Sequence, residues 1–216
     1  INRETKEIEL PQSFKDMVND PNYYICYCHR SEKEEYIIEK IKEKRKIKVA
    51  VYVKEESKRL PVIIPLILDN LKKSLKLKGF ELEINYFGNA LPICINNGIE
   101  CGKLSKKQLH ELYCECDFGM VASLTNISLV PYEMIAAGLP VIEFKDGTFD
   151  YFFSKETAIL CDLSYKHLEK EILYYVENPA ELEEMTIRAN KSILSLSWEK
   201  SANQFVEILD HVDTVE

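Results

Sequence analysis

One stretch of the sequence combines hydroxyl residues, a carboxylate and a helix-ending glycine. It runs from Ser123 to Glu133 as Ser-Leu-Thr-Asn-Ile-Ser-Leu-Val-Pro-Tyr-Glu and reaches Gly138 five residues later. Ser128 can cap the start of a helix, and Gly138 can adopt the left-handed conformation that ends one. The N–H groups and the dipole at a helix N-terminus attract anions such as a diphosphate. The stretch therefore predicts an anion site formed by Thr125, Asn126, Ile127, Ser128, Leu129 and Val130.

Glu133 adds a group that could bind hydroxyls. It falls in the second turn of the expected helix, where a carboxylate can accept hydrogen bonds from the vicinal hydroxyls of a ribose. The alternative is a surface glutamate that binds nothing, because units of strand, turn, helix and strand with a capping serine are common.

A sheet is needed to position these residues, and short apolar runs alternate with capped helical patterns along the chain. This alternation predicts an α/β fold, a Rossmann-like parallel sheet with helices on both faces. The expected strands are Ile47–Val53, Leu82–Phe87, Phe118–Ala122, Val141–Phe144 and Ala158–Cys161. The third of these strands would bring the hydroxyl-rich stretch to the carboxyl edge of the sheet, where such folds bind ligands.

Capping patterns mark where the helices should begin. The marked starts are Ser31 with Glu34, Ser105 with Gln108, Asn178 before Pro179, and Ser197 before Trp198. In each pattern a side chain can accept a hydrogen bond from an N–H of the first turn. Pro61 and Pro65 cannot both lie inside a helix, so the helix that runs to about Lys78 must begin close to them.

The first part of the chain fits the alternating pattern poorly. An apolar run at Tyr23–Cys28 could form a strand, and a charged helix is expected from Glu32 to about Lys44. We interpret residues 1–46 as a linker or the tail of a preceding domain. Residues 47–216 are expected to form one Rossmann-like domain that ends in a crossing helix. The chain begins at Ile1 and not at Met, which suggests a piece of a longer protein.

Charge and hydropathy argue against several classes of partner. Acidic residues outnumber basic ones by 36 to 28, and the net charge of −8 provides no basic field for nucleic acid. The longest apolar run, residues 60–68, is far shorter than the ~20 residues that span a bilayer. We expect no nucleic-acid partner, no transmembrane segment and a cytoplasmic location. Peripheral membrane association through another part of the protein stays open.

The cysteines raise a metal hypothesis. The chain has seven, an odd number that is typical of reduced thiols in a protein of this size. Cys26 with Cys28 and Cys114 with Cys116 form pairs separated by one residue, but the two-residue separation usual for zinc is absent. We therefore expect no metal site.

The stretch around Glu133 resembles the C-terminal signature of retaining glycosyltransferases of the GT-B fold, family four. In that family a Glu, seven residues and a second Glu precede a Gly-Leu-Pro-Val run. Glu133 matches the second Glu, which contacts ribose in the family, whereas Thr125 stands where the first Glu usually contacts the donor sugar. The variant Ser-Leu-Thr-Asn-x-Ser-Leu-x-Pro-x-Glu-Met resembles the rhamnosyltransferase branch of bacterial surface polysaccharide synthesis.

The resemblance extends over about residues 47–210. Ile47–Arg59 is similar to the first βα loop of the family, whose basic residues bind the donor diphosphate. This similarity implies catalytic roles for Lys54 and Arg59, since cations offset the phosphate charge. For Lys58 we favour a solvated surface role. The Phe-Gly that ends at Gly88 is similar to a strand-ending pair of the family, which places Gly88 in the donor site.

The resemblance implies an enzyme that moves a sugar from a nucleoside diphosphate sugar to a hydroxyl of a glycan, with retention and without metal or other cofactor. The acceptor would bind to an N-terminal domain that this chain lacks, so the fragment alone should bind donor better than it turns it over. Two alternatives stay open. Because Thr125 replaces a glutamate, the domain could bind a nucleotide or a partner without catalysis. A nucleotide-sugar epimerase would share the fold.

Overall fold

A computed structural model describes residues 45–145, 151–194 and 196–213. Contacts assign the sheet-bearing body, which ends at Ile193, and the last helix, α8 (Trp198–Asp213), to separate units, so each is described by itself. The expectations for residues 1–44, namely the Tyr23–Cys28 strand, the Ser31 cap and the charged helix from Glu32, lie outside the described residues. The interpretation of residues 1–46 as a linker or tail therefore stays a prediction.

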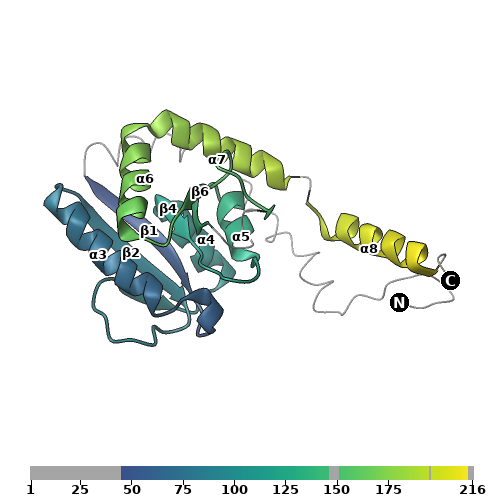
Figure 1. Ribbon diagram of the computed structural model, residues 1–216, viewed down its shortest axis with the longest axis horizontal. Coiled ribbons are helices and arrows are strands. Elements are labelled where there is room, and N and C mark those ends of the chain that lie inside the picture. Colours follow the sequence, from purple (N-terminus) through teal and green to yellow (C-terminus); the bar gives the residue numbers. More distant parts are fainter. Residues whose placement is uncertain (1–44, 146–150, 195, 214–216) are drawn as a thin grey trace. The chain divides into compact units, whose positions relative to one another are not determined.

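The sheet has six strands, all parallel, in the order β3-β2-β1-β4-β5-β6 (Figure 1). Their bounds are β1 Lys46–Val53, β2 Glu81–Gly88, β3 Ile99–Gly102, β4 Phe118–Met120, β5 Val141–Phe144 and β6 Ile159–Cys161. The predicted Rossmann-like parallel sheet is confirmed. The strand order reverses between β1 and β4, which is the point where this class of sheet binds ligands.

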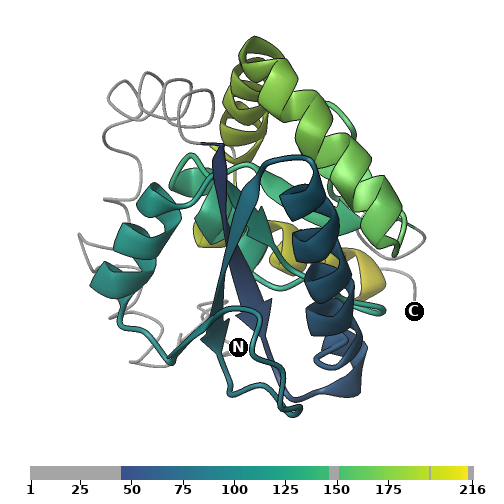
Figure 2. The ribbon, with the colours of Figure 1, turned by 90° about the vertical axis from the view of Figure 1, so that its left-hand side faces the viewer.

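Helices cover both faces of the sheet. They are α3 Ile63–Leu77, α4 Lys106–Glu115, α5 Val130–Ala136, α6 Tyr165–Glu177 and α7 Pro179–Ile193, with a short 3-10 helix, η3, at Ser57–Arg59. In Figure 2 the blue α3 and the teal α4 lie on opposite sides of the first strands. The core on one face contains α3 and α6, the core on the other contains α4 and α5, and α7 contributes to both.

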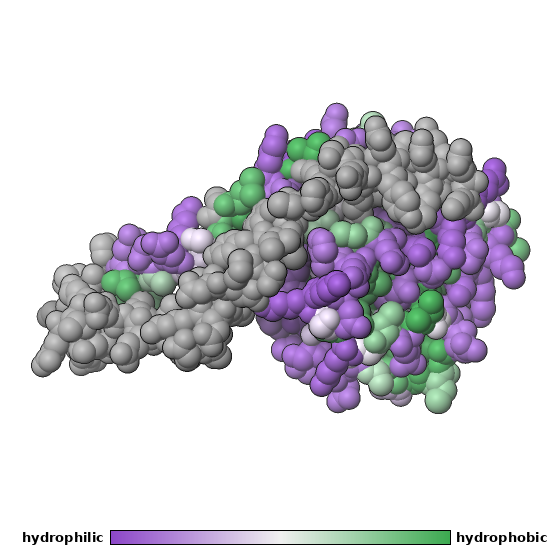
Figure 3. Space-filling model, turned by 180° about the vertical axis from the view of Figure 1, so that it is seen from behind, coloured by the Kyte–Doolittle hydropathy of each residue, from purple (hydrophilic) through white to green (hydrophobic). Residues whose placement is uncertain are grey.

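Alternating side chains of β1 explain why two cores form. Val49 and Val51 enter the core under α3, whereas Ala50, between them, enters the core under α4 and α5. A strand buried on both faces reads as a continuous apolar run, which is the pattern that predicted this strand. On the face shown in Figure 3, the coloured residues are mostly hydrophilic, with small separate apolar patches among them. Within the described ranges, every helix is too short or too polar to cross a bilayer.

Several predicted element boundaries are confirmed. Ser105 and Gln108 form the expected capping box, with Gln108 N donating to Ser105 Oγ (3.4 Å) and Ser105 N donating to Gln108 Oε1 (3.0 Å). The Ser197 hydroxyl caps α8 by accepting from Lys200 N (3.1 Å). Helix α3 begins at Ile63, between the two prolines that were expected to mark its start.

One strand was not predicted, and two are shorter than predicted: β4 by two residues and β6, which begins at Ile159 and not at Ala158, by one. Strand β3, Ile99–Gly102, pairs only with β2 at the edge of the sheet, and half of it is exposed. An exposed edge strand has no apolar run for a sequence pattern to detect. Strand β4 ends at Met120 because its ladder to β5 ends there, although Val121 and Ala122 remain buried.

Candidate functional site

The carboxyl ends of β1 and β4 are neighbours, and the connections that follow them run to opposite sides of the sheet. Val51 lies beside Met120 in the register of the two strands. The chain after β1 turns back through α3 toward β2, whereas the chain after β4 continues through α5 toward β5. Leu124 N donates to the carbonyl oxygen of Lys58 (2.9 Å) and ties the two connections together. The residues predicted from both segments therefore meet at one edge.

Arg59 is the most unusual residue at this edge. It ends η3, and Leu60 after it adopts a left-handed conformation (φ 53°) that turns the chain toward α3. Arg59 is only 5% exposed, and its Nε and Nη1 are buried without a hydrogen-bond partner. Buried donors without partners are costly and rare in native structures. An anion is the ligand that would satisfy them.

Lys54, the other predicted cation, lies in a different environment. Its Nζ forms an exposed ion pair with Glu56 (2.6 Å), which also pairs with Lys58 (3.0 Å). Hydrogen bonds from Lys54 and Lys58 lower the pKa of Glu56 to about 2. The hydrogen bond to Glu56 raises the pKa of Lys54, and the charge of Arg59 lowers it by a smaller amount. The charges of the two predicted cations thus influence each other, but the ion pair with Glu56 partly neutralises Lys54.

The turn after β4 is held by hydrogen bonds among its own residues. Ser123 Oγ donates to the carbonyl oxygen of Asn126 (2.8 Å) and accepts from Thr125 N (3.4 Å). Thr125 Oγ1 donates to Asn126 Oδ1 (3.1 Å), and Asn126 Nδ2 donates to the carbonyl oxygen of Ile127 (3.2 Å). Ser123 is buried, whereas Thr125 and Asn126 are exposed. Ser123 is the structural centre of this turn, a role that the sequence analysis did not predict.

The predicted start of α5 is wrong. The helix begins at Val130 with Leu129 as its N-cap and no side-chain cap, and the Ser128 hydroxyl is buried without a hydrogen-bond partner. Pro131 accounts for the missing cap, because it stands three residues after Ser128 and has no N–H to donate to the serine hydroxyl. Its missing N–H also leaves Val130 and Tyr132 as the amide donors of the first turn. The attraction of this helix start for an anion is therefore weaker than predicted.

Glu133 consequently lies in the first turn of α5 and not in the second. It is half-buried, and burial raises its pKa while the charge of Lys106 lowers it by a smaller amount. Lys106 is the first residue of α4, so the starts of α4 and α5 lie within electrostatic reach of each other. The sequence analysis did not single out Lys106, because a lysine at a helix start is a common surface residue. Gly138 ends α5 with φ 73°, as predicted.

Gly88 lies at the same edge and is required there by the backbone. It ends β2 with φ 107°, and a Cβ atom at this position would lie 2.3 Å from the carbonyl oxygen of Val53. That oxygen accepts from Asn89 N (2.9 Å), so the ends of β1 and β2 are closely joined. The predicted contact of Gly88 with a ligand stays a prediction, but its packing gives an independent reason for the glycine.

Glu143 is a further charged residue of the site region that the sequence analysis missed. It is the third residue of β5, is 0% exposed, and neither of its carboxylate oxygens has a hydrogen-bond partner. Burial raises the pKa of Glu143 well above its usual value, and the charge of Arg59 lowers it by a smaller amount. The available signal was a charged residue in the run Val-Ile-Glu-Phe, where a buried parallel strand is expected to be apolar.

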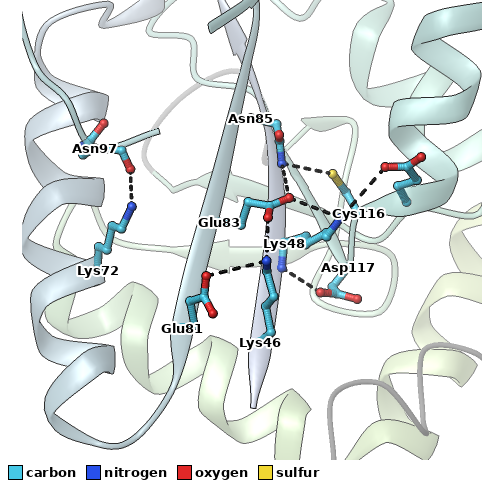
Figure 4. Close-up of polar contacts among 10 residues, drawn as sticks. Lys46, Lys48, Lys72, Glu81, Glu83, Asn85, Asn97, Cys116 and Asp117 are labelled. Atoms are coloured by element: carbon cyan, nitrogen blue, oxygen red, sulfur yellow. Dashed lines mark hydrogen bonds and ion pairs between the residues drawn. The ribbon is translucent and has the colours of Figure 1, made fainter. Parts of the chain in front are cut away.

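The amino edge of the sheet carries a second group of charged residues (Figure 4). Glu83 pairs with Lys46 (2.8 Å) and Lys48 (3.2 Å). Asp117 Oδ2 accepts from the backbone N of Lys48 (2.7 Å), and Asn85 Nδ2 donates to Cys116 Sγ (3.9 Å). The polar groups at this edge thus have ion-pair and hydrogen-bond partners within the protein.

The Cys114 and Cys116 pair does not converge on one point. Cys114 Sγ lies 3.6 Å from His110 Nε2 on α4, whereas Cys116 is buried next to Asn85. In the part of the chain that the structure describes, no group of three or more potential ligands is placed to hold a metal ion. Cys26 and Cys28, the other pair, lie outside that part.

Comparisons with known proteins give matches in structure only. No family model and no curated protein matches the sequence. Sucrose-phosphate synthase from Thermosynechococcus elongatus superposes with a TM-score of 0.64 and 13% identity over 89% of this chain and 51% of that chain. Anabaena HepE in complex with UDP-glucose gives 0.62 and 14% over 87% and 55%. WaaG, a glycosyltransferase involved in lipopolysaccharide biosynthesis, gives 0.59 and 14% over 83% and 51%.

These likenesses establish the fold. The six-stranded parallel sheet is one Rossmann-like half of the GT-B architecture, as the sequence analysis predicted. The chain spans about half the length of the solved chains that it resembles.

Proposed function

We propose that this chain is the donor-binding half of a retaining, metal-independent glycosyltransferase that takes its sugar from a nucleoside diphosphate sugar. The observation that carries the proposal is the buried Arg59 guanidinium, whose Nε and Nη1 have no hydrogen-bond partner, at the point where the strand order reverses. A cation in this state favours an anionic ligand. The shared fold with HepE, described in complex with UDP-glucose, supports a nucleoside diphosphate sugar as that ligand.

Six of the predicted residues have a place in this proposal, whereas Ile127, Ser128, Leu129 and Val130 belong to a helix start that attracts an anion less than predicted. Arg59 would bind the diphosphate and stabilise the charge that develops on it when the sugar leaves, with Lys54 at the rim. Glu133 would accept hydrogen bonds from the ribose, and Gly88 would let the ligand approach the backbone. The exposed turn of Thr125 and Asn126 would face the sugar. The resemblance around Glu133 favours family four and its rhamnosyltransferase-like branch, hence a bacterial polysaccharide as product.

A second domain would complete the enzyme. Because the chain spans about half of the solved glycosyltransferases that it resembles, we propose that the glycan acceptor binds to a domain beyond this chain. A cytoplasmic location, with peripheral attachment to the membrane through the rest of the protein, fits the use of a nucleotide donor. No cofactor besides the donor is required by this scheme.

The test is a melting-temperature screen of the 216-residue chain with uridine, thymidine and guanosine diphosphates and with the matching nucleosides. A ligand at a hundred times its dissociation constant should add about 2.7 kcal/mol to the free energy of unfolding. Because the strongest proposed contacts go to phosphate, at least one diphosphate should raise the melting temperature while its nucleoside barely does. Equal shifts from nucleoside and diphosphate would contradict a phosphate-anchored site.

A non-catalytic nucleotide-binding domain is the second candidate. It is favoured by the turn at Thr125, whose side chain donates to Asn126 and offers no carboxylate to a sugar. Transfer of sugar by the full-length protein, measured with every donor that the domain binds, separates the two candidates. Binding without transfer would favour the non-catalytic domain.

A further inference from the structure

The side chain of Asn126 is held in one orientation within the turn after β4. Its Oδ1 accepts from the Thr125 hydroxyl (3.1 Å), and its Nδ2 donates to the carbonyl oxygen of Ile127 (3.2 Å). A half-turn of the amide would place Oδ1 against the Ile127 oxygen, and two acceptors at hydrogen-bond distance repel each other. The Ile127 carbonyl therefore determines which end of the amide is the oxygen and which is the nitrogen.

The oriented amide still has one hydrogen bond of each kind to offer. An asparagine side chain has two N–H donors and an oxygen with two lone pairs. The bonds to Thr125 and Ile127 use one N–H and one lone pair, so toward the described residues one donor and one acceptor stay available. Asn126 is exposed, so a ligand can reach both. A donor beside an acceptor fits two neighbouring hydroxyls, since each hydroxyl can both donate and accept.

Ser123 fixes the backbone that carries this amide. It is 4% exposed, and its Oγ donates to the carbonyl oxygen of Asn126 (2.8 Å) and accepts from Thr125 N (3.4 Å). The next residue, Leu124, donates its N–H to the carbonyl oxygen of Lys58 (2.9 Å), which precedes Arg59. The turn that presents the amide is thus attached to the segment that carries the proposed phosphate-binding residue.

We propose that Asn126 determines the specificity for the donor sugar by binding two neighbouring hydroxyls of that sugar, and that Ser123 is the positioning residue that holds its amide in place. Nδ2 of Asn126 donates to one hydroxyl, and Oδ1 accepts from the other. This inference rests on the proposed function, because it assigns both residues to the sugar end of the same site.

A neutral amide selects a sugar differently from a carboxylate. A carboxylate only accepts hydrogen bonds, whereas the amide accepts from one hydroxyl and donates to the oxygen of the next. A sugar that lacks either hydroxyl would leave one end of the amide without a partner in the complex, which reduces affinity. Orientation of the amide before binding limits the entropy that is lost when the sugar binds. The chain should therefore prefer a donor sugar with two adjacent free hydroxyls.

The experiment compares binding of a nucleotide sugar with binding of the diphosphate of the same base, measured by calorimetry. The probe pairs are UDP-glucose with UDP, GDP-mannose with GDP, and dTDP-glucose with dTDP. Four forms of the 216-residue chain are compared, namely wild type, Ser123→Ala, Asn126→Ala and the double variant. Asn126→Ala should weaken binding of the nucleotide sugar about tenfold, as expected for one or two lost neutral hydrogen bonds, and binding of the diphosphate less than about twofold.

Ser123→Ala should have two separable effects. It should lower the melting temperature equally in the wild-type and Asn126→Ala backgrounds, because the partners of the hydroxyl are backbone atoms that both backgrounds retain. Affinity for the nucleotide sugar should fall about fivefold in the wild-type background and less than about twofold in the Asn126→Ala background, because Ser123 acts through that side chain. A purely structural residue would change affinity equally in both backgrounds.

Asn70→Ala is the matched control. Asn70 is also an exposed asparagine whose Nδ2 donates to a backbone oxygen (3.0 Å), but it lies on α3. Its replacement should leave the affinities for the nucleotide sugar and for the diphosphate unchanged. A loss in the control equal to that in Asn126→Ala would overturn the assigned role of Asn126.

The outcomes separate this inference from the proposed function. Equal losses of nucleotide sugar and diphosphate in Asn126→Ala, no loss of either, or a wild-type chain that binds only the diphosphate would overturn the role of Asn126 and leave a phosphate-anchored site in place. Equal effects of Ser123→Ala on affinity in both backgrounds would overturn the role of Ser123. A folded wild-type chain that binds none of the probes would overturn the proposed function and this inference with it. Because Asn126 is exposed, failure of Asn126→Ala to fold would also overturn its assigned role.

Discussion

The two edges of the sheet treat charged residues in opposite ways. At the amino edge, Glu83 pairs with Lys46 and Lys48, and Asp117 accepts from the chain beside them. At the carboxyl edge, Arg59 and Glu143 are more deeply buried, yet Nε and Nη1 of Arg59 and both carboxylate oxygens of Glu143 have no hydrogen-bond partners. The sheet thus has a closed polar cluster at its amino edge and buried polar atoms without partners at its carboxyl edge.

This difference indicates which edge binds a ligand. A cluster whose members satisfy one another gains little from a further partner, whereas unsatisfied buried donors gain a full hydrogen bond when an anion arrives. Natural proteins leave buried polar atoms without hydrogen-bond partners mainly at functional sites. Substitutions at the carboxyl edge should therefore affect ligand binding, and substitutions at the amino edge should affect only stability.

The largest effect is expected from Arg59→Met. The substitution removes the buried guanidinium while keeping an apolar side chain of similar length, so binding of a nucleoside diphosphate should weaken by about 2 to 3 kcal/mol, or thirtyfold or more. Calorimetry with the best diphosphate of the screen measures this. Lys46→Met is the matched control at the amino edge, and a similar loss of affinity in the control would remove the distinction between the edges.

Glu133→Gln should have the next largest effect. It should weaken nucleotide binding by roughly 1 to 3 kcal/mol, the range for a lost charge-assisted hydrogen bond, without unfolding the chain. Because the proposed contact is with ribose hydroxyls, the loss should be greater for a ribonucleotide than for its 2′-deoxy form. An identical response of the two forms would show that Glu133 does not contact the ribose.

A smaller effect is expected from Thr125→Val in the full-length enzyme. The lost hydroxyl should cost about 1 kcal/mol in transition-state binding, or several-fold in the rate of transfer, while diphosphate affinity stays nearly unchanged. Serine at the same position retains the hydroxyl and is the control. If Thr125→Val leaves transfer unchanged and Thr125→Glu increases it, the turn is an eroded form of the family motif.

The smallest effect should come from Glu83→Gln. Its partners Lys46 and Lys48 are both partly exposed, and ion pairs of that kind contribute less than about 1 kcal/mol to the free energy of unfolding. Denaturant unfolding should show this small loss, with nucleotide affinity unchanged. A change in affinity would mean that the two edges are coupled.

The sequence predicted the framework better than the site. The apolar runs of β1, β2 and β5, the capping box at Ser105 and the left-handed Gly138 each depend on neighbouring residues, so they are visible in a local pattern. The burial of Arg59 depends on packing between segments that are far apart in the sequence, and no local pattern shows it.

The wrong position of the α5 start has a local cause that the sequence did contain. Ser128 and Pro131 both mark helix starts, and the sequence analysis gave the serine more weight. Pro131 removes the N–H three residues after Ser128 that a serine cap would use, and such a cap contributes only about 1 kcal/mol. The stronger constraint determined where the helix begins.

The hydrogen bond from Leu124 to Lys58 limits how the carboxyl edge can move. It joins the connection that carries Arg59 to the connection that carries Thr125, so a displacement of one connection either breaks this bond or takes the other along. Entry of a bulky donor that keeps this bond would then move both connections together. The distance between Arg59, proposed to bind the phosphates, and Thr125, proposed to face the sugar, would then change little during that motion.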